Sequence, residues 1–474
     1  MPETAKSPAA ARASAAPAAA DNDAVTDAAA FFEAHPDIET LEAFIVDVNG
    51  VLRGKRIPRS GALKVFKDGV RLPRSVFAVD IWGHDALEAG LVTQTGDNDG
   101  ICRAVPGTLS RAPWLEQPTA QVMMTMEDSN GRAFFADPRQ VLKRVLDFYA
   151  KEGLTPVVAA ELEFYLLDGK PDERGFPQPP LSPRTGRRVQ ASQMYGMGEV
   201  QDFAAILTDI NRACIEQDIP ADTTISENGP GQYEINLLHV ADALKAADQA
   251  ILLKRIIKGV ARRHGMEATF MAKPYGDKAG NGMHVHFSVI DAEGNNIFAG
   301  TDNKGSEKLR HALGGLMATM TEAAAIFAPN YNSYRRFQPG SHAPTRIAWG
   351  YDNRTAALRV PESGIAATRI EHRVSGSDAN PYLAIAAILA GAFHGLSGRM
   401  DPGAPLTGNV YESMAKHLPD VWEDALEIFE QSGFAEHYFG AQYRHVYHAC
   451  KWQEKELLER QVSSIEYDAY LRDL

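Results

Sequence analysis

Cysteine is scarce in this chain. Its 474 residues include only Cys102, Cys214 and Cys450, which are far apart, odd in number and without a Cys-x-x-Cys pair. Neither a disulfide framework nor a zinc ribbon is indicated by this pattern. We therefore expect the protein to work in a reducing cytoplasm.

Long apolar runs are lacking too. The longest, 382–393, is too short to span a bilayer, and Asn380-Pro381 ahead of it predicts the start of a buried helix. Residues 1–28 are rich in Ala, Pro and Ser without an apolar centre, so they predict a disordered tail rather than a signal peptide. We expect no membrane partner.

Basic residues are fewer than acidic ones, with 48 Lys and Arg against 61 Asp and Glu, so the formal net charge is −13. This balance argues against a nucleic-acid-binding surface, whereas amine substrates are compatible with it. A Gly-x4-Gly-Lys-Ser/Thr phosphate loop is absent, because residues 50–56 have the wrong spacing and residue types. If the chain uses ATP, metals and arginines must hold the phosphates.

Two folded domains are expected. Residues 36–130 are strand-rich, with apolar runs at 44–48 and 121–124 around a glycine-rich stretch at 80–100, and predict a small separate domain.

The larger domain is expected over 137–474. Asp137-Pro138 predicts the start of a helix that ends at Gly153, and strands mixed with helices follow. Residues 171–188, rich in Pro, Gly and Arg, predict a loop excursion.

What the chain does contain is four strands with one polar face. In 158–167, Glu161 and Glu163 alternate with apolar residues, so both carboxylates share a face. The second strand carries Gln232, Glu234 and Asn236 on one face, and Glu227 lies shortly before it. The third carries His284, His286 and Ser288 on one face, and the fourth carries Arg369, Glu371 and Arg373. A single strand of this kind is ordinarily a solvated face. Together, five carboxylates and one imidazole indicate Mg²⁺ or Mn²⁺ rather than structural zinc, and the arginines indicate an anionic substrate.

Six motifs in order resemble the glutamine synthetase family, in the bacterial type I lineage. They cover nearly the whole chain after residue 40 and are 161–164, 227–234, 280–286, 332–336, 353–359, and 369–373 followed by Asn380-Pro381-Tyr382. Within the family the chain resembles the γ-glutamylpolyamine and glutamate–putrescine ligases. The resemblance implies an α+β fold, with a small N-terminal β-grasp domain and a large catalytic domain of antiparallel sheet and flanking helices. It also implies a homo-oligomer, a dodecamer of two hexameric rings with active sites between neighbouring subunits.

The resemblance also implies roles for individual residues. One divalent metal would be held by Glu163, Glu227 and Glu234, and a second by Glu161, His284 and Glu371. The glutamate site would comprise Arg336 and Arg373 with Glu163, Gly280 and His284. The site for ATP, the co-substrate, would comprise His286, Ser288, Arg354, Arg359 and Arg369. Catalytic roles would fall to Arg354, Arg359, His342 and Asp80.

Such a site has a chemical reason. Forming an amide from a carboxylate and an amine is uphill in water, so ATP must first convert the carboxylate into γ-glutamyl phosphate. Two metals and arginines neutralise the charge that builds up as the two anions approach. The amine then displaces phosphate.

One departure from the family pattern concerns the amine. Ammonia-using relatives carry a glutamate where this chain has His342, and no acidic residue stands between Arg336 and Asp352. Histidine can act as a base, but when neutral it does not attract ammonium. We therefore predict an organic amine, such as putrescine, a polyamine or another alkylamine, with a pocket formed by Asp80, Trp82 and His342.

Alternatives remain at this stage. One is an ammonia-dependent glutamine synthetase, a second is a non-catalytic relative, and a third is a polyamine-binding protein without turnover. The non-catalytic relative is disfavoured because all six metal-ligand positions are kept. Which amine is used is left open.

Overall fold

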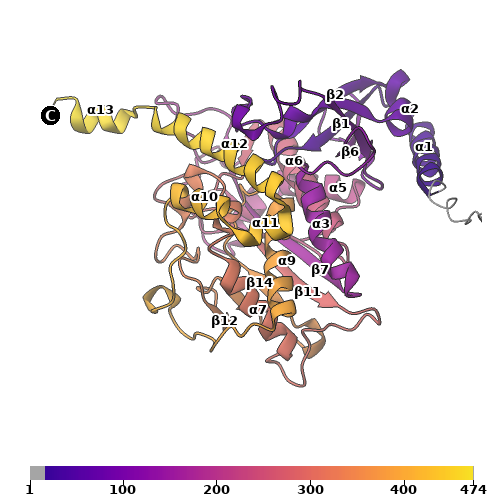
Figure 1. The fold of residues 1–474 in the computed structure, drawn as a ribbon. Helices are drawn as coiled ribbons and strands as arrows, with labels where there is room; N and C mark the ends of the chain where they lie inside the picture. Colours follow the sequence, from indigo (N-terminus) through magenta and orange to yellow (C-terminus); the bar gives the residue numbers. More distant parts are fainter. Residues whose placement is uncertain (1–15, 473) are drawn as a thin grey trace, which may run out of the picture.

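Two β-sheets organise the computed structural model, which describes residues 16–472 and residue 474 (Figure 1). The first sheet has the order β2-β1-β6-β4-β3, with β5 paired to β6. Its strands are β1 (Thr40–Val46), β2 (Leu52–Pro58), β3 (Val70–Pro73), β4 (Asp99–Ala104), β5 (Ser110–Arg111) and β6 (Thr119–Glu127). All lie within 36–130, the stretch expected to form the small domain.

The second sheet has the order β12-β13-β14-β11-β7-β9-β8, with β10 paired to β7. Its strands are β7 (Thr155–Asp168), β8 (Ala221–Ser226), β9 (Gln232–Leu237), β10 (Met266–Thr269), β11 (Met283–Ile290), β12 (Trp349–Tyr351), β13 (Leu358–Val360) and β14 (Ile370–His372). Its described pairs are antiparallel except β12 with β13. The predicted α+β class with an antiparallel sheet is confirmed.

Helices cover these sheets and connect them (Figure 1). They are α1 (Ala16–Ala34), α2 (Arg59–Asp68), α3 (Pro138–Lys151), α4 (Met197–Asp202), α5 (Ala204–Glu216), α6 (Ala243–Arg263), α7 (Glu307–Thr319), α8 (Ala324–Phe327), α9 (Pro381–Gly398), α10 (Trp422–Glu430), α11 (Gly433–Phe439), α12 (Ala441–Glu459) and α13 (Ser464–Tyr470). In Figure 1, α12 runs to the left of the first sheet, and α13 projects beyond the rest of the molecule at the upper left.

The N-terminal prediction needs a correction. Residues 16–28 were expected to belong to a disordered tail, but they lie in α1, which contacts α2. Alanine has the highest intrinsic helix propensity, which explains a helix in a segment without an apolar centre. Residues 1–15 of the expected tail lie outside the described residues.

Two predicted helix starts are confirmed. Asp137 caps α3 by accepting a hydrogen bond from Arg139 N at 2.9 Å, and the same carboxylate accepts from Met126 N of β6 at 2.8 Å. Asn380 caps α9 through Tyr382 N at 3.0 Å. The Asp137 carboxylate therefore joins the first sheet to the helix layer of the second.

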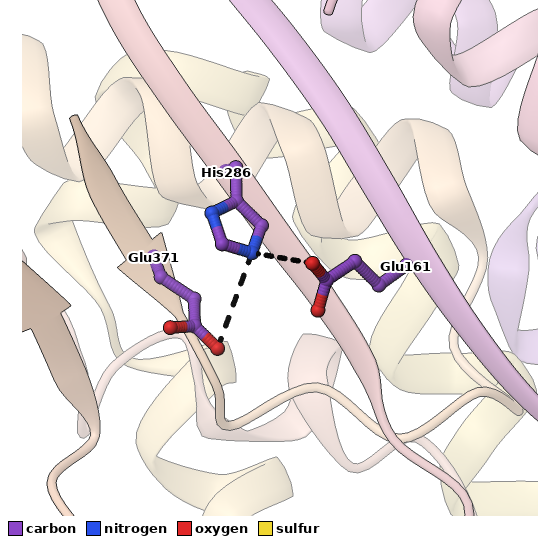
Figure 2. Close-up of side chains that lie close together, drawn as sticks. All are labelled: Glu161, His286 and Glu371. Atoms are coloured by element: carbon purple, nitrogen blue, oxygen red, sulfur yellow. Dashed lines mark ion pairs between the residues drawn. The ribbon is translucent and has the colours of Figure 1, made fainter. Parts of the chain in front are cut away.

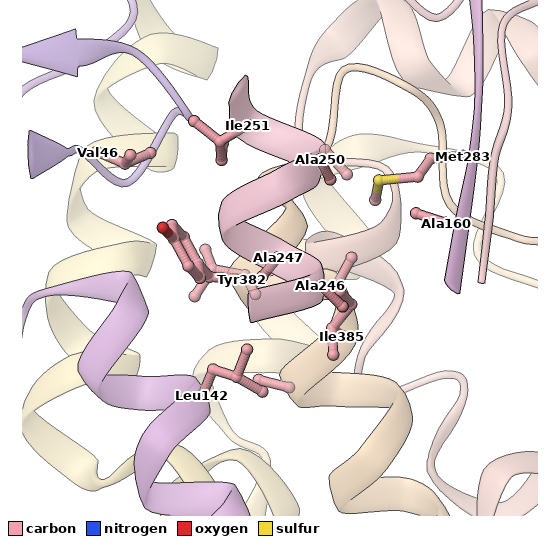
Figure 3. Packing of buried hydrophobic residues seen from close by; sticks show 14 of the residues in the cluster. Val46, Leu142, Ala160, Ala246, Ala247, Ala250, Ile251, Met283, Tyr382 and Ile385 are labelled. Atoms are coloured by element: carbon pink, nitrogen blue, oxygen red, sulfur yellow. The ribbon is translucent and has the colours of Figure 1, made fainter. Parts of the chain in front are cut away.

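The core between the two sheets centres on α6 (Figure 3). Four α6 residues, Ala246, Ala247, Ala250 and Ile251, face side chains from α3, α9, β7, β11 and β1. The helix α9 is long and apolar enough to cross a membrane by length and composition, but 72% of that window is buried inside the protein. It is a core helix, as the apolar run predicted.

Candidate active site

The strand β7 is the base of the site, because its pairing brings distant polar residues opposite its two glutamates. Glu161 stands opposite His284 of β11 and Asn236 of β9, and Glu163 stands opposite Glu234 of β9. The alternate residues Leu162 and Phe164 are fully buried on the other face. The predicted alternation of β7 is confirmed.

Glu161 meets two histidines and a second carboxylate at one end of this polar face. Figure 2 shows His286 of β11 between Glu161 and Glu371 of β14, with Nε2 lying 2.9 Å from Glu161 Oε1 and 4.0 Å from Glu371 Oε1. His284 Nδ1 lies 3.5 Å from Glu161 Oε2 and 3.9 Å from Glu371 Oε1. The structure thus adds His286 to the predicted group of Glu161, His284 and Glu371.

Electrostatics keep both of these carboxylates ionised. Burial favours the neutral form of Glu161, but hydrogen bonds with His284 and His286 outweigh it and lower its pKa. Burial likewise opposes ionisation of Glu371, yet the charges of Arg373 and the two histidines lower its pKa to about 2.

In a second group of carboxylates the pKa values are raised rather than lowered. Ligand atoms of Glu163, Glu227 and Glu234 lie within 4.8 Å of one another. Burial and the charge of Glu163 raise the pKa of Glu227 to about 7, and burial with the other glutamates raises that of Glu234 well above its usual value. Like charges this close destabilise one another unless a cation lies between them.

These groups fit divalent metals. Glu234 also belongs to a group with Glu161 and His284, so the two clusters adjoin. Oxygen ligands with one or two imidazoles suit Mg²⁺ or Mn²⁺, and a cation would relieve the repulsion among the three raised-pKa carboxylates. The residues present therefore fit the predicted pair of metals.

Arginines border the metal-type clusters. Arg359 Nη1 donates to Glu371 Oε2 at 2.8 Å, and Arg373 Nη1 donates to Glu371 Oε1. Arg354 is exposed and lines a cavity together with Arg359 and Arg373. These guanidinium groups supply positive charge next to the carboxylates, where an anionic substrate would need it.

Arg336 is held across the glycine loop. Its buried guanidinium donates to Val374 O at 2.7 Å and to Arg373 O at 3.3 Å. A Cβ at Gly280 would lie 2.9 Å from Arg336 Cγ, and one at Gly282 would lie 2.8 Å from Arg336 Nη2. These glycines are needed for the close approach, and Gly282 N also donates to Glu163 Oε2 at 2.7 Å.

The segment after Arg336 reaches the same cavity. This cavity has a volume of about 820 Å³ and is lined by Arg336, by residues 338–343 and by all members of the two clusters except His286. His342 is exposed there, and its φ of +59° is unusual for a residue other than glycine. The structure therefore brings the predicted base, His342, into the cavity that holds the predicted metal and glutamate residues.

The predicted nucleotide residues lie further along the sheet. Arg369 Nε donates to His286 Nδ1 at 3.2 Å, which links two of them directly. Ser288 follows on the same face of β11, opposite Val157. His286, Ser288 and Arg369 do not line the 820 Å³ cavity, whereas Arg354 and Arg359 do.

Asp80 and Trp82 are not brought to this cavity within one chain. The Asp80 carboxylate is fully buried and accepts from Trp82 N at 3.0 Å, His84 N at 2.9 Å and Gln453 Nε2 of α12 at 2.9 Å. Trp82 is half exposed. A role for this loop in amine binding requires a neighbouring subunit and stays a prediction.

Several lining residues were missed by sequence reasoning. Met194, Tyr195, Lys273 and Asp277 all line the cavity and come from irregular segments. Tyr195 has a φ of +61°, and its N–H donates to Ser226 O at 2.9 Å. The strand periodicity that predicted the polar faces carries no signal for residues in loops.

Comparison with known proteins agrees with this geometry. Residues 135–470 match the family model described as glutamine synthetase, catalytic domain. The chain is 42% identical, over 94% of both chains, to γ-glutamylputrescine synthetase PuuA of Escherichia coli strain K12. It is 36% identical to glutamate–isopropylamine ligase of a Pseudomonas species, covering 90% of this chain and 93% of that protein. Among solved structures, GmaS in complex with ADP matches with a TM-score of 0.79 and 27% identity, over 94% of this chain and 99% of that chain.

Proposed function

This chain belongs to the glutamine synthetase family, and we propose that it is an ATP-dependent ligase joining the γ-carboxylate of glutamate to an organic amine. The predictions of the family and of a carbon–nitrogen ligase are confirmed by the family match and by the curated relatives. Those relatives are named for putrescine and isopropylamine, which favours an organic amine over ammonia.

The observation that carries the proposal is that the exposed His342 lines the cavity. Between Arg336 and Asp352 the chain has this histidine and no acidic residue. An alkylamine has a pKa near that of lysine, about 10.4, and must lose a proton before it attacks. A neutral imidazole is a base for that proton and exerts no selective attraction on ammonium.

The other side chains divide the remaining work. Arg336 and Arg373 bind the glutamate carboxylate, and the glycine loop at 280–282 packs against Arg336. Arg354 and Arg359 neutralise charge on the transferred phosphoryl group. Mg²⁺ or Mn²⁺, held by the two clusters, would supply further positive charge there.

The bonds balance in two steps. A γ-carboxylate oxygen attacks the γ-phosphorus of ATP, so ADP leaves and γ-glutamyl phosphate forms. The amine nitrogen, which has already given one proton to His342, then attacks the carbonyl carbon of γ-glutamyl phosphate. The C–O bond to phosphate breaks, and the departing phosphate takes the second proton from the nitrogen. The products are a γ-glutamyl amide, ADP and phosphate.

We also propose an oligomeric state and a cellular location. The protein acts as a homo-oligomer in the cytoplasm, most simply as the dodecamer of two hexameric rings that the resemblance implies. A feature of the single chain supports assembly. In the loop around Asp80, Ile81 and Trp82 present exposed apolar surface that a neighbouring subunit would cover.

The test is ADP release by the purified protein with glutamate, ATP and Mg²⁺. Ammonium, isopropylamine, ethanolamine, putrescine and spermidine are compared at matched concentrations. We expect an organic amine to give at least a tenfold higher kcat/KM than ammonium. Equal or better use of ammonium would support the glutamine synthetase alternative instead, and Glu163→Gln, which removes a metal-cluster charge, serves as the inactive control.

A further inference from the structure

A second cavity, separate from the active site, lies between the two sheets. It has a volume of about 550 Å³ and shares no lining residue with the active-site cavity. Its walls come from the β1–β2 turn at 49–52, from Trp114 of the first domain, and from α6 and Phe270 of the second. The cavity therefore spans the junction of the two domains.

One face of α6 makes this junction strongly cationic. Lys254, Arg255, Lys258 and Arg262 all line the cavity, against the two carboxylates of Glu42 and Asp378. Arg255 pairs with Glu42, and Arg262 Nε lies 3.3 Å from Glu267 Oε2 outside the cavity. Lys258 forms no hydrogen bond or ion pair with any residue that the structure describes.

Two of these ammonium groups crowd the same ring. Lys254 Nζ lies 5.4 Å and Lys258 Nζ 5.7 Å from the centroid of Phe270. Lys254 donates only to carbonyls, Ser377 O at 2.5 Å and Ala379 O at 3.1 Å. Burial and the charge of Lys258 lower the pKa of Lys254 to about 7. Neither ammonium group forms an ion pair with a carboxylate among the residues that the structure describes, and the charges of Asp378 and Glu267 reach Lys254 and Lys258 only at longer range.

A further donor in the cavity wall also lacks an acceptor. The buried Nε of Arg255 has no hydrogen-bond acceptor among the described residues. Trp114 stacks closely on α6, since a Cβ at Gly259 would lie 2.3 Å from Trp114 Cδ1. The cavity thus combines cationic donors with the aromatic walls of Trp114 and Phe270, which suits an anion carrying a small carbon body.

We propose that this junction cavity is a binding site for a small organic dianion, a dicarboxylate or a phosphate ester, held by Lys254 and Lys258. The anion would accept hydrogen bonds from both ammonium groups and occupy the volume beside Trp114. Its binding does not depend on the ligase reaction, so the proposal stands or falls separately from the proposed function.

The test is isothermal titration of the full-length protein with succinate, inorganic phosphate and phenyl phosphate. Lys258→Glu removes the unpaired cation at an exposed position, and Lys258→Arg keeps its charge. Lys245→Glu is the matched control, because Lys245 lies on the same helix but does not line the cavity. Arg354→Met reports binding in the active-site cavity instead.

We expect Lys258→Glu to weaken binding of at least one probe tenfold or more. Lys258→Arg, Lys245→Glu and Arg354→Met should stay within threefold of the unmodified protein. The ranking of succinate against phenyl phosphate distinguishes a dicarboxylate from a phosphate ester. Equal weakening by Lys258→Glu and Lys245→Glu, or loss of binding in Arg354→Met alone, would overturn the proposal. So would dissociation constants above 10 mM for every probe, which would leave an acidic segment of a neighbouring copy as the counter-ion.

Discussion

The Nε2 atom of His286 lies 2.9 Å from Oε1 of Glu161, so a residue predicted to line the nucleotide pocket contacts a predicted metal ligand. Residues that orient a ligand typically contribute 10–100-fold to metal affinity. We expect His286→Ala to weaken Mn²⁺ binding about tenfold in the absence of ATP, measured by titration followed by electron paramagnetic resonance. Ser288→Ala, on the same strand face, should leave it unchanged. An effect on the KM for ATP with unaltered Mn²⁺ affinity would restrict His286 to the nucleotide.

Glu227 should destabilise the metal-free protein at high pH. Its folded pKa of about 7 lies above the unfolded value near 4.3, so the stability present below the lower value is lost as the pH rises through the higher one. Because Glu227 is partly exposed, we expect Glu227→Gln to stabilise the metal-free protein at pH 8 by only about 1–2 kcal/mol.

Thermal unfolding with EDTA at pH 5 and pH 8 measures this effect. The gain should be smaller at pH 5 and should reverse when Mg²⁺ is added, because the substitution removes a metal ligand. A variant that unfolds at a lower temperature than the unmodified protein at pH 8 without metal would contradict the charge repulsion described for this cluster.

His342→Glu should shift amine selectivity. A carboxylate on the segment after Arg336 would attract ammonium, which the imidazole does not. We expect the ratio of kcat/KM for ammonium to that for putrescine to rise at least tenfold, as measured by ADP release. His342→Gln, which can neither attract a cation nor accept the proton, should slow both reactions. Unchanged relative rates in His342→Glu would remove this position from amine selection.

Asp277 should distinguish diamines from monoamines. Among the described lining residues it is the one carboxylate outside the two metal-type clusters, and it pairs with its neighbour Lys278 at 2.9 Å. The distant ammonium of a diamine would find a counter-ion there. We expect Asp277→Asn to raise the KM for putrescine about fivefold while that for isopropylamine changes less than twofold. Parallel changes for both amines would indicate a general effect on the cavity.

Asp378 should act as a positioning residue for glutamate. Its Oδ2 accepts from Asn330 Nδ2 at 2.8 Å and from Ser333 Oγ at 2.6 Å, at the start of the short helix η3 (Tyr331–Arg336) that ends at Arg336. We expect Asp378→Ala to raise the KM for glutamate several-fold with a smaller change in kcat. Asp401→Ala, at an exposed aspartate just beyond the C-terminal end of α9, is the control. A fall in kcat with constant KM would assign Asp378 a different role.

Local alternation predicted which strand faces carry the polar side chains, whereas the grouping of these side chains into two metal-type clusters came from the resemblance to the family. Glu161 and Glu163 share a face because strand side chains alternate, and the turn at 229–231 brings Glu227 back toward Glu234. The long-range register was not predictable, since nothing local specifies that His286 stands opposite Glu371. The resemblance to the family assigned His286 to the nucleotide pocket, so its contact with Glu161 was not predicted.

Loop positions were less accessible to sequence reasoning. Asp80 was predicted to face the amine, yet its carboxylate is satisfied by its own loop and by Gln453, which is far away in the sequence. Tyr195 and Asp277 reach the cavity through tertiary contacts that have no periodic signature. The junction cavity was missed for the same reason, because its cations come from α6 and its aromatic walls from other segments.

The spread of the metal ligands along β7, β9, β11 and β14 has a consequence for how the chain folds. In chain order, Glu161 lies in β7, the first strand of the catalytic sheet, and Glu371 lies in β14, the last. The cluster in Figure 2 therefore forms only after β14 has paired with the rest of the sheet. Pairings between such remote segments form late, because loop closure must precede them. A refolding chain should therefore acquire tight metal binding in its slowest phase. Metal binding would then report that the sheet is complete, and the ion would not nucleate folding of the sheet.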